Sequence, residues 1–249
     1  MIRKQSLVGH FGDLLIGLFR YQQWLRRVVL VSRLKFMDSF QVIENLRLSE
    51  STFRLRTERP TVPIRAGQCF SVGTKDLGIN REYSMYSAAE DDFIDFLIRE
   101  VADGIVTPAL GRCKPGDLVE IGGPYGEFCL PALAVAEDSF VFIASGTGIA
   151  PFHSFVKSFP WLDYTLYHGI RYEDERYEAD DYEASRYISA VSQPLSGGGE
   201  RITAVLSRAE LNPESHYYLC GNRQMITDTV QILRDRGVPG GRIFMETFF

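Results

Sequence analysis

Cysteine and histidine are scarce in this sequence and are widely dispersed. The 249 residues contain four Cys and four His, none at the close spacings that zinc or iron–sulfur centres require. We therefore expect no metal centre. Dispersed thiols also exclude a disulfide-rich scaffold, and they are typical of a reducing compartment such as the cytoplasm. These residues are Cys69, Cys113, Cys129, Cys220, His10, His153, His168 and His216.

Positive charge and long apolar runs are lacking as well. With 27 Lys and Arg against 32 Asp and Glu, the formal net charge is −5, so the chain lacks the basic footprint that nucleic-acid binding needs. The apolar runs at residues 14–19 and 28–31 stop well short of the roughly 20 residues that cross a bilayer. We expect neither a nucleic-acid partner nor an integral membrane span.

Residues 1–36 form a basic N-terminal extension with seven Lys and Arg and one acidic residue, Asp13. An Arg-rich leader of this kind is typical of a targeting or membrane-surface segment. The alternative is that Met37 is the true start and that the extension is translated upstream sequence. We favour the alternative, because a regular strand pattern begins directly after Met37.

The rest of the chain changes texture once. Up to about residue 130, short apolar segments alternate with Gly- and Pro-rich turns, which predicts an antiparallel barrel or sandwich. Beyond residue 136, continuous apolar runs alternate with helical stretches, which predicts a parallel sheet covered on both faces. The expected strands are 40–48, 52–57, 68–73, 93–101 and 118–122, then 139–144, 164–168, 187–191 and 216–220.

The predicted fold is therefore a two-domain β + α/β chain. An antiparallel β-barrel occupies residues 37–132, and a parallel-sheet α/β domain occupies residues 133–249. Residues 1–36 are expected to lie outside this fold.

The strongest local signal is a glycine-rich turn after a buried strand. Gly146-Thr147-Gly148 follows the apolar run 139–144, and Pro151 stands where a helix would begin. Such a turn presents backbone N–H groups and a helix N-terminus to a pyrophosphate. The alternative is a tight strand-to-helix turn without a ligand. Its position at the start of the α/β half favours nucleotide binding.

Two segments of the first half are weaker signals for anion binding. Arg81-Glu82-Tyr83-Ser84 lies between two predicted strands, and its arginine could clamp a phosphate. Taken alone, it is more typical of a strand with a surface arginine. Gly104-Ile105-Val106-Thr107 precedes a short predicted helix, 108–112, and is either a second anion-binding turn or a plain loop.

Taken together, these segments resemble the ferredoxin–NADP reductase family, and the C-terminus resembles its bacterial branch. The resemblance covers residues 37–249. It implies an FAD-binding antiparallel barrel followed by an NADP(H)-binding α/β domain, with the flavin between them. The motifs, in order, are Arg81-x-Tyr83-Ser84, Gly104-x-Val106-Thr107-x-x-Leu110, Lys114-Pro115-Gly116-Asp117, Gly146-Thr147-Gly148-Ile149-Ala150-Pro151, Cys220-Gly221-Asn222-x-x-Met225 and Glu246-Thr247-Phe248-Phe249.

The resemblance also implies roles for individual residues. Arg81 would bind the FAD pyrophosphate, Tyr83 would stack on the flavin, and Ser84 would hydrogen-bond near flavin N5. Cys220 would lie beside the nicotinamide, with Glu246 as the acidic group near it, so Ser84, Cys220 and Glu246 are the implied catalytic residues. The remaining implied cofactor contacts are Glu82, Ile105, Val106 and Thr107 for FAD, and Gly146, Thr147 and Gly148 for NADP(H).

The two terminal phenylalanines are implied flavin contacts. Phe248 would cover the second face of the flavin, and Phe249 would be the additional terminal aromatic residue of some bacterial members. A ring at this place must move, or share space, before nicotinamide can stack on the flavin. The alternative is that both residues close a hydrophobic seam.

Preference for NADPH depends on contacts to its 2′-phosphate. Arg171 and Arg201 stand where the family places arginines that bind this group. Ser192-Gln193 departs from the Ser-Arg that the family often has, which weakens the predicted phosphate site. We favour NADPH; the alternative is that both are ordinary surface arginines.

Residues 171–183 hold seven acidic side chains. With no His among them, the segment is interpreted as a solvated, acidic helix face rather than a metal site.

The predicted function is hydride transfer between NADP(H) and FAD, with single electrons passing to ferredoxin or flavodoxin. Two alternatives stay open: an NAD(P)H-dependent flavin reductase or oxygenase reductase component, and a flavoprotein redox sensor without turnover. We expect a monomer. Ferredoxins are acidic, so a basic docking rim is expected on the FAD domain. Its candidates are Arg47, Arg54, Arg56, Arg65, Lys75, Arg112 and Lys114.

Overall fold

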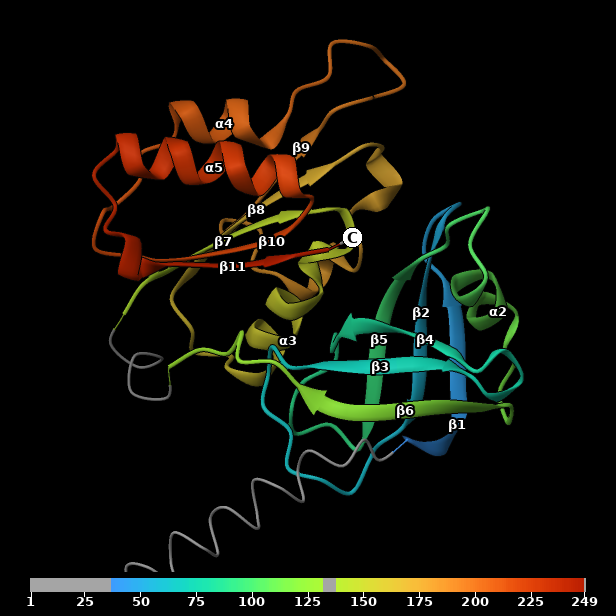
Figure 1. Cartoon of the computed structure of the whole chain (residues 1–249). Coiled ribbons are helices and arrows are strands. Elements are labelled where there is room, and N and C mark those ends of the chain that lie inside the picture. The colour runs from blue at the N-terminus through green and yellow to red at the C-terminus, as the bar shows by residue number, and fades with distance from the viewer. Residues whose placement is uncertain (1–36, 132–137, 249) are drawn as a thin grey trace, which may run out of the picture. The chain divides into compact units, whose positions relative to one another are not determined.

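A computed structural model describes residues 37–131 and 138–248 of the chain (Figure 1). The predictions for the N-terminal extension, for a domain boundary at residues 132 and 133, and for Phe249 lie outside the described residues.

The first half folds as a six-stranded sheet in the order β4-β3-β6-β1-β2-β5 (Figure 1). Every strand pair for which the register is defined in this sheet is antiparallel, and an antiparallel bridge between Met85 and Phe96 joins the end of β4 to β5. The predicted antiparallel, barrel-like fold is confirmed. The strands are β1 (Met37–Arg47), β2 (Thr52–Glu58), β3 (Cys69–Thr74), β4 (Ile79–Ser84), β5 (Phe93–Arg99) and β6 (Leu118–Tyr125), with one short helix, α2 (Val106–Arg112).

Alternating side chains explain why this sheet forms. Phe53 and Leu55 of β2, and Phe70 and Val72 of β3, are fully buried and lie two residues apart on their strands, whereas β5 is buried throughout its interior around Phe96. Burial of these side chains holds the two ends of the sheet around one core.

Strand β4 is not in the set of predicted strands, although a strand with a surface arginine was the interpretation of this segment taken alone. The segment around Arg81 was placed between strands, but it pairs with β3 along its length, from Thr74↔Ile79 to Cys69↔Ser84. Only Ser84 of its six residues is buried, so the strand carries no hydrophobic alternation from which it could be recognised.

The second half is a five-stranded parallel sheet in the order β11-β10-β7-β8-β9 (Figure 1). Its strands are β7 (Phe140–Ser145), β8 (Tyr164–Ile170), β9 (Tyr187–Val191), β10 (His216–Gly221) and β11 (Ile243–Thr247). Its helices are α3 (Ala150–Ser158), α4 (Ile202–Arg208) and α5 (Arg223–Asp235).

Helices cover both faces of this sheet, as predicted. On one face Phe142 stacks on Phe152 of α3, with ring centroids 4.9 Å apart. On the other face Ile143 and Leu219 pack with Leu206 of α4 and Leu233 of α5. Successive side chains of a strand point to opposite faces, so Phe142 and Ile143 belong to separate clusters. No helix of the described residues is long and apolar enough to cross a membrane.

The acidic segment is not a helix, so that prediction was wrong. It forms two short 3-10 turns, η4 (Glu173–Glu175) and η5 (Ala179–Asp181). Glu175, Tyr177 and Tyr182 within it are buried. Tyr177 and Tyr182 bury their rings and so pack the segment against the rest of the protein. The carboxylates of Glu178 and Asp181 form ion pairs.

Candidate active site at the carboxyl ends of the parallel strands

The predicted phosphate-binding turn follows β7 directly. A 3-10 turn, η3 (Gly146–Ile149), leads into α3, and Pro151 lies in the first turn of that helix. Neither η3 nor α3 has a side-chain cap or an acidic residue in its first turn. Unpaired backbone N–H groups at such an N-terminus favour an anion.

Two glycines let the turn touch strand β10. A Cβ atom at Gly148 would lie 2.3 Å from the carbonyl oxygen of Cys220. A Cβ atom at Gly221, which has φ +130°, would lie 2.3 Å from Ser145 Oγ. Gly148 therefore serves the packing of the turn against β10, whereas Gly146 and Thr147 line the adjoining cavity.

A buried histidine, His168, contacts the backbone of the turn. His168 Nε2 lies 2.9 Å from the carbonyl oxygen of Gly146, and Nδ1 lies 2.8 Å from the Tyr187 hydroxyl. A carbonyl only accepts, so Nε2 donates and Nδ1 accepts from Tyr187. Burial lowers the pKa of His168 to about 4, so the ring is neutral at physiological pH.

Ser145 and Asn222 complete the edge of the turn, through contacts for which no local pattern in the sequence is a signal. The Asn222 backbone N–H donates to Ser145 Oγ over 2.8 Å. The Asn222 side chain accepts from the backbone N–H groups of Gln224 and Met225 and so caps α5.

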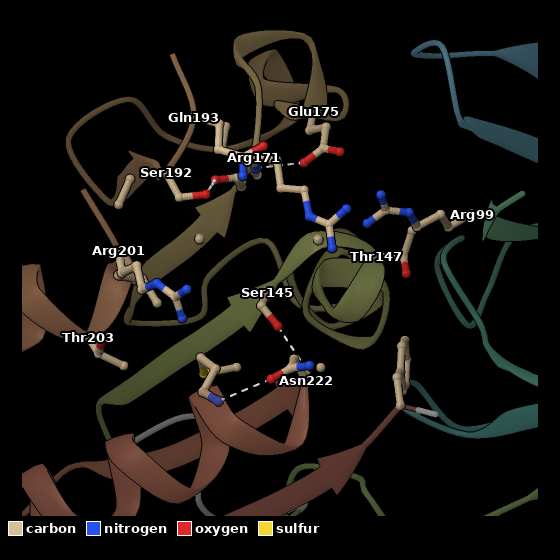
Figure 2. Close-up of a pocket in the computed structure, with 18 of the residues that line it drawn as sticks. Arg99, Ser145, Thr147, Arg171, Glu175, Ser192, Gln193, Arg201, Thr203 and Asn222 are labelled. Atoms are coloured by element: carbon tan, nitrogen blue, oxygen red, sulfur yellow. Dashed lines mark hydrogen bonds between the residues drawn. The ribbon is translucent and has the colours of Figure 1, made fainter. Parts of the chain in front are cut away.

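A cavity of about 540 Å³ opens in front of the turn. Three arginines line it: Arg99 at the end of β5, Arg171 after β8, and Arg201 before α4. Figure 2 shows the side chains of Arg99 and Arg171 pointing to the same region beside Thr147, while Arg201 approaches from the opposite side. Within the described residues, none of the three guanidinium groups has an ion pair.

Arg99 was missed in the sequence, because nothing in a strand's own pattern shows that its last residue faces a cavity of the other sheet. Ser192 and Gln193 also line the cavity, as expected of the segment that follows β9. Cations that have no ion pair among the described residues and gather around a glycine-rich turn favour a polyanionic ligand.

The three implied catalytic residues meet at the edge of the two sheets. Ser84 Oγ donates to Glu246 Oε1 over 2.8 Å. Cys220 lies beside Glu246 in the register of β10 and β11 and is fully buried. Burial raises the pKa of Glu246, opposed by the Ser84 hydrogen bond and assisted by the charge of Glu82. Burial and the neighbouring Glu246 hold the pKa of the Cys220 thiol well above its ordinary value.

The residues implied for FAD lie together next to this group. The Tyr83 hydroxyl is buried without a hydrogen-bond partner, and burial raises its pKa to about 12. Arg81 and Glu82 are exposed on β4, and the Arg81 guanidinium donates to the carbonyl oxygen of Asn80 over 2.9 Å. An orphaned hydroxyl beside an accessible arginine fits a ribityl-phosphate chain.

The second FAD segment begins helix α2. Ile105 is exposed, whereas the Val106 side chain is buried in the barrel core, so only its backbone can face a ligand. Thr107 Oγ1 accepts from the Val101 N–H over 2.9 Å and so braces the turn. The helix has no side-chain cap and no acidic residue in its first turn, which leaves its N-terminus suited to a phosphate.

Phe248 lies between the two regions. Its backbone N–H donates to the Gly221 carbonyl over 2.9 Å, and the residue lines the cavity in front of the glycine turn. The ring also packs against the large core cluster. Both readings of this residue, a ring that covers a cofactor and a ring that closes a seam, are compatible with this position.

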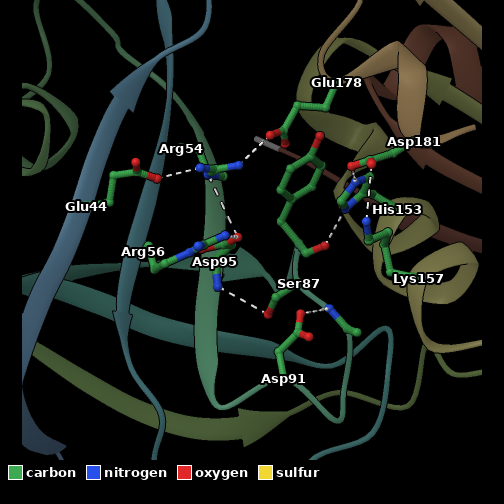
Figure 3. Close-up of polar contacts among 12 residues, drawn as sticks. Glu44, Arg54, Arg56, Ser87, Asp91, Asp95, His153, Lys157, Glu178 and Asp181 are labelled. Atoms are coloured by element: carbon green, nitrogen blue, oxygen red, sulfur yellow. Dashed lines mark hydrogen bonds and ion pairs between the residues drawn. The ribbon is translucent and has the colours of Figure 1, made fainter.

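A histidine from another element, His153, lies against the acidic segment. His153 of α3 lies with Glu178 and Asp181 so that one ligand atom of each falls within 4.8 Å of the others. Figure 3 shows that each already has partners: Arg54 for Glu178, Lys157 for Asp181, and a backbone carbonyl, that of Tyr86, for His153. The reason given for excluding a metal, the lack of a nearby His, was wrong, but these contacts form an ion-pair network.

The expected docking rim is smaller than predicted. Arg54 and Arg56 are largely enclosed and pair with acidic residues of the same molecule, so they are unsuited to a partner surface. Arg47 and Arg65 form exposed ion pairs with Glu100 and Glu127. For Lys75, Arg112 and Lys114, no ion pair occurs within the part of the chain that the structure describes.

Comparison with known proteins agrees with this arrangement. Residues 38–129 match the oxidoreductase FAD-binding domain, and residues 142–231 match the oxidoreductase NAD-binding domain. The flavodoxin/ferredoxin–NADP reductase of Escherichia coli is 30% identical over 207 residues, which are 73% of this chain and 83% of that protein. The toluate 1,2-dioxygenase electron transfer component of Pseudomonas putida is 28% identical over 83% of this chain and 66% of its own length.

Solved structures share the fold. A ferredoxin–NADP+ reductase from Neisseria gonorrhoeae, solved with bound FAD and NADP, matches with a TM-score of 0.74 and 24% identity over 86% of this chain and 99% of its own. An Amycolatopsis cytochrome P450 reductase matches with the same TM-score and 25% identity, over 86% of this chain and 71% of its own.

A barrel-like half that matches an FAD-binding domain, joined to a parallel-sheet half that matches an NAD-binding domain, defines a flavin- and nicotinamide-nucleotide-dependent oxidoreductase. The chain belongs to the ferredoxin–NADP reductase family.

Proposed function

We propose that this protein is a flavodoxin/ferredoxin–NADP reductase, which moves hydride between NADP(H) and FAD and single electrons between FAD and ferredoxin or flavodoxin. The observation that carries the proposal is the cavity in which three arginines, none with an ion pair among the described residues, surround a glycine turn. That turn contacts the backbone of Cys220, which pairs with Glu246 of the Ser84–Glu246 hydrogen bond. The 30% identical Escherichia coli relative bears this activity in its name.

The chain's residues divide the work of binding. In this proposal Arg81, the Tyr83 hydroxyl and the first turn of α2 hold FAD, which when bound supplies the hydride acceptor and the one-electron carrier. The N–H groups of Gly146 and Thr147 bind the pyrophosphate of the nicotinamide nucleotide. Neutral His168 keeps the turn in place through the Gly146 carbonyl.

Ser84, Cys220 and Glu246 prepare the place where hydride transfers. Glu246 holds its proton to higher pH than an exposed glutamate, because burial disfavours its carboxylate. Its hydrogen bond from Ser84 fixes the carboxyl group toward the flavin side. Cys220, protonated and fully buried, contributes packing rather than charge. Phe248 excludes water from the cavity until the nicotinamide ring enters.

We propose NADPH as the preferred nucleotide, with Arg171 and Arg201 as the residues that recognise it. Neither guanidinium is neutralised by an acidic side chain of the described residues, and Glu175, four residues after Arg171, accepts from the Arg171 backbone N–H over 2.8 Å. Gln193 stands where the family often has an arginine, so discrimination between NADPH and NADH depends on Arg171 and Arg201.

A second function, the reductase component of an oxygenase, is favoured by the toluate dioxygenase relative, which matches a larger share of this chain. Both functions share the chemistry at the flavin and differ in the electron acceptor. A flavoprotein sensor without turnover is the third alternative. We propose a monomer in a reducing, cytoplasmic setting; all four cysteines are unpaired.

The test is anaerobic reduction of cytochrome c by the purified, FAD-loaded protein with NADPH or NADH, with and without ferredoxin or flavodoxin. The proposal expects NADPH to be preferred and the carriers to raise the rate strongly. Rapid reduction of free flavin with no effect of the carriers would favour the alternative reductase. A bound flavin that neither nucleotide reduces would exclude the enzyme.

A further inference from the structure

Residues 172–183, which we name the strap, connect the nucleotide cavity to the barrel. At one end Glu175 Oε2 accepts from the Arg171 N–H over 2.8 Å. In its middle the Tyr177 hydroxyl lies 3.0 Å from Thr52 Oγ1, and Glu178 pairs with Arg54. At the other end Asp181 binds His153 and Lys157 of α3. The strap therefore touches both sheets of the molecule.

The contacts on the barrel side are enclosed. The Thr52 side chain is buried, Tyr177 is 2% exposed, and the Arg54 side chain retains 13% of its accessible surface. Removing a partner from an enclosed contact costs more than losing an exposed ion pair, although Arg54 also pairs with Glu44 and Asp95 and would keep those partners without Glu178. These two contacts therefore fix the middle of the strap to β2.

The backbone of Glu178 is unusual. It has φ +45° and ψ +46°, the left-handed region, and it is the one residue other than glycine with positive φ in the part of the chain described. A side chain at such a position is unfavourable unless surrounding contacts hold it. The ion pair between Glu178 and Arg54, drawn in Figure 3, is a contact that holds the residue in this conformation.

The point where the strap meets the barrel adjoins Arg99. Thr52, the partner of Tyr177, is paired directly with Arg99 in the register of β2 and β5. Arg99 is also close enough to Tyr177 for its charge to lower the pKa of that phenol, although burial dominates and raises it to about 12. The strap therefore starts directly after Arg171, and its contact with Thr52 lies beside Arg99.

We propose that Glu178 and Tyr177 are positioning residues for the nicotinamide nucleotide, holding the strap on the barrel so that Arg171 and Arg99 face one ligand. The two arginines belong to different sheets, and both line the cavity beside Thr147 (Figure 2). Two guanidinium groups repel each other, so their approach needs a mechanical restraint when the ligand is absent. The strap is that restraint. This inference rests on the proposed function, since it concerns the same nucleotide.

The test compares Glu178→Gln and Tyr177→Phe with Asp180→Asn, a matched charge change on an exposed strap residue. The readout is the Kd of NADP+ for the FAD-loaded protein, measured by calorimetry, beside FAD content and the midpoint of thermal unfolding. Glu178→Gln and Tyr177→Phe should each raise the Kd at least about fivefold, the low end of typical coupling between sites. Asp180→Asn should leave it unchanged.

A double-mutant cycle separates positioning from loss of stability. Once Arg99→Ala has removed one of the aligned groups, Glu178→Gln should add little to the Kd, because there is no longer a pair to align. Fully additive effects, or equal effects of Glu178→Gln and Asp180→Asn, would overturn the strap proposal. Failure of the unsubstituted protein to bind either NADP+ or NAD+ would instead overturn the proposed function.

Discussion

The Ser84 hydroxyl donates a 2.8 Å hydrogen bond to the Glu246 carboxylate across 162 residues of sequence. Ser84 ends β4 of the first sheet, and Glu246 lies on β11 at the edge of the second. The bond therefore joins the two halves at the place where the implied flavin and nicotinamide rings would meet.

This bond makes Glu246 the first target for substitution. We expect Glu246→Gln to lower the rate of flavin reduction by NADPH about 100-fold, the lower range for loss of a positioned acid. Stopped-flow absorbance under anaerobic conditions measures this rate. Met245→Leu, a change at the exposed neighbour, is the control and should leave the rate unaltered.

The same residue predicts a pH dependence. The pKa of Glu246 is raised by burial, so the carboxyl group is protonated at low pH and loses its proton as pH rises through the raised value. If the protonated form assists hydride transfer, the rate falls on the alkaline side of that pKa. The Gln variant cannot titrate, and its rate should be flat over the same range; a profile parallel to that of the unsubstituted protein would contradict this role.

Arg99 is expected to bind the nucleotide even though it belongs to the barrel. Arg99→Ala should raise the Kd of NADP+ and of NAD+ alike, by about tenfold, because a charged hydrogen bond contributes roughly 1.5–3 kcal/mol. Arg112→Ala is the matched control, since Arg112 lies on α2 outside the cavity. An unchanged affinity in Arg99→Ala would remove Arg99 from the site.

Arg171 and Arg201 should decide between the two nucleotides. Replacing either by Ala should lower kcat/KM for NADPH by about tenfold or more while NADH is affected much less, because only NADPH carries the 2′-phosphate. Steady-state kinetics with both nucleotides measures this. Equal losses for NADPH and NADH would indicate that these arginines bind a group common to both.

His168 predicts how stability depends on acid. Its pKa is about 4 in the folded protein, against an ordinary value of 6.5, because burial disfavours the imidazolium. Between these values the unfolded chain binds a proton that the folded protein does not, so the free energy of unfolding falls as pH drops from 6.5 to 4, by up to ~3 kcal/mol.

Denaturant titrations across this range should show that loss, and His168→Gln, which keeps a donor for the Gly146 carbonyl, should show a shallower slope. Nuclear magnetic resonance gives a direct check. A His168 ring that is protonated at pH 6 would contradict the assignment.

Local patterns in the sequence predicted most of the fold, because buried strands can be recognised from apolar alternation or from continuous apolar runs. All nine predicted strands occur, with ends shifted by a few residues. Strands β4 and β11 are absent from the predicted strands because their residues are mostly half-buried or exposed. Pairing with a neighbouring strand, rather than a hydrophobic pattern, defines them.

The candidate site was predictable only in part, and for a similar reason. The turn at Gly146 carries its own local signature. The meeting of Ser84 with Glu246 came from the family resemblance, since no local pattern joins residues so far apart. Arg99 and the strap contacts depend on how a barrel strand and an acidic loop come together, which neither segment encodes by itself.

The close contact of Gly148 with the Cys220 backbone has a consequence for how this enzyme can diversify. The glycine turn after β7 meets strand β10 so closely that a Cβ atom at Gly148 would lie 2.3 Å from the Cys220 carbonyl oxygen. Under the proposed function, main-chain geometry would then set the distance from the bound pyrophosphate to the reacting ring. Substitutions among the surrounding arginines would change which nucleotide binds and would leave the position of its ring unaltered.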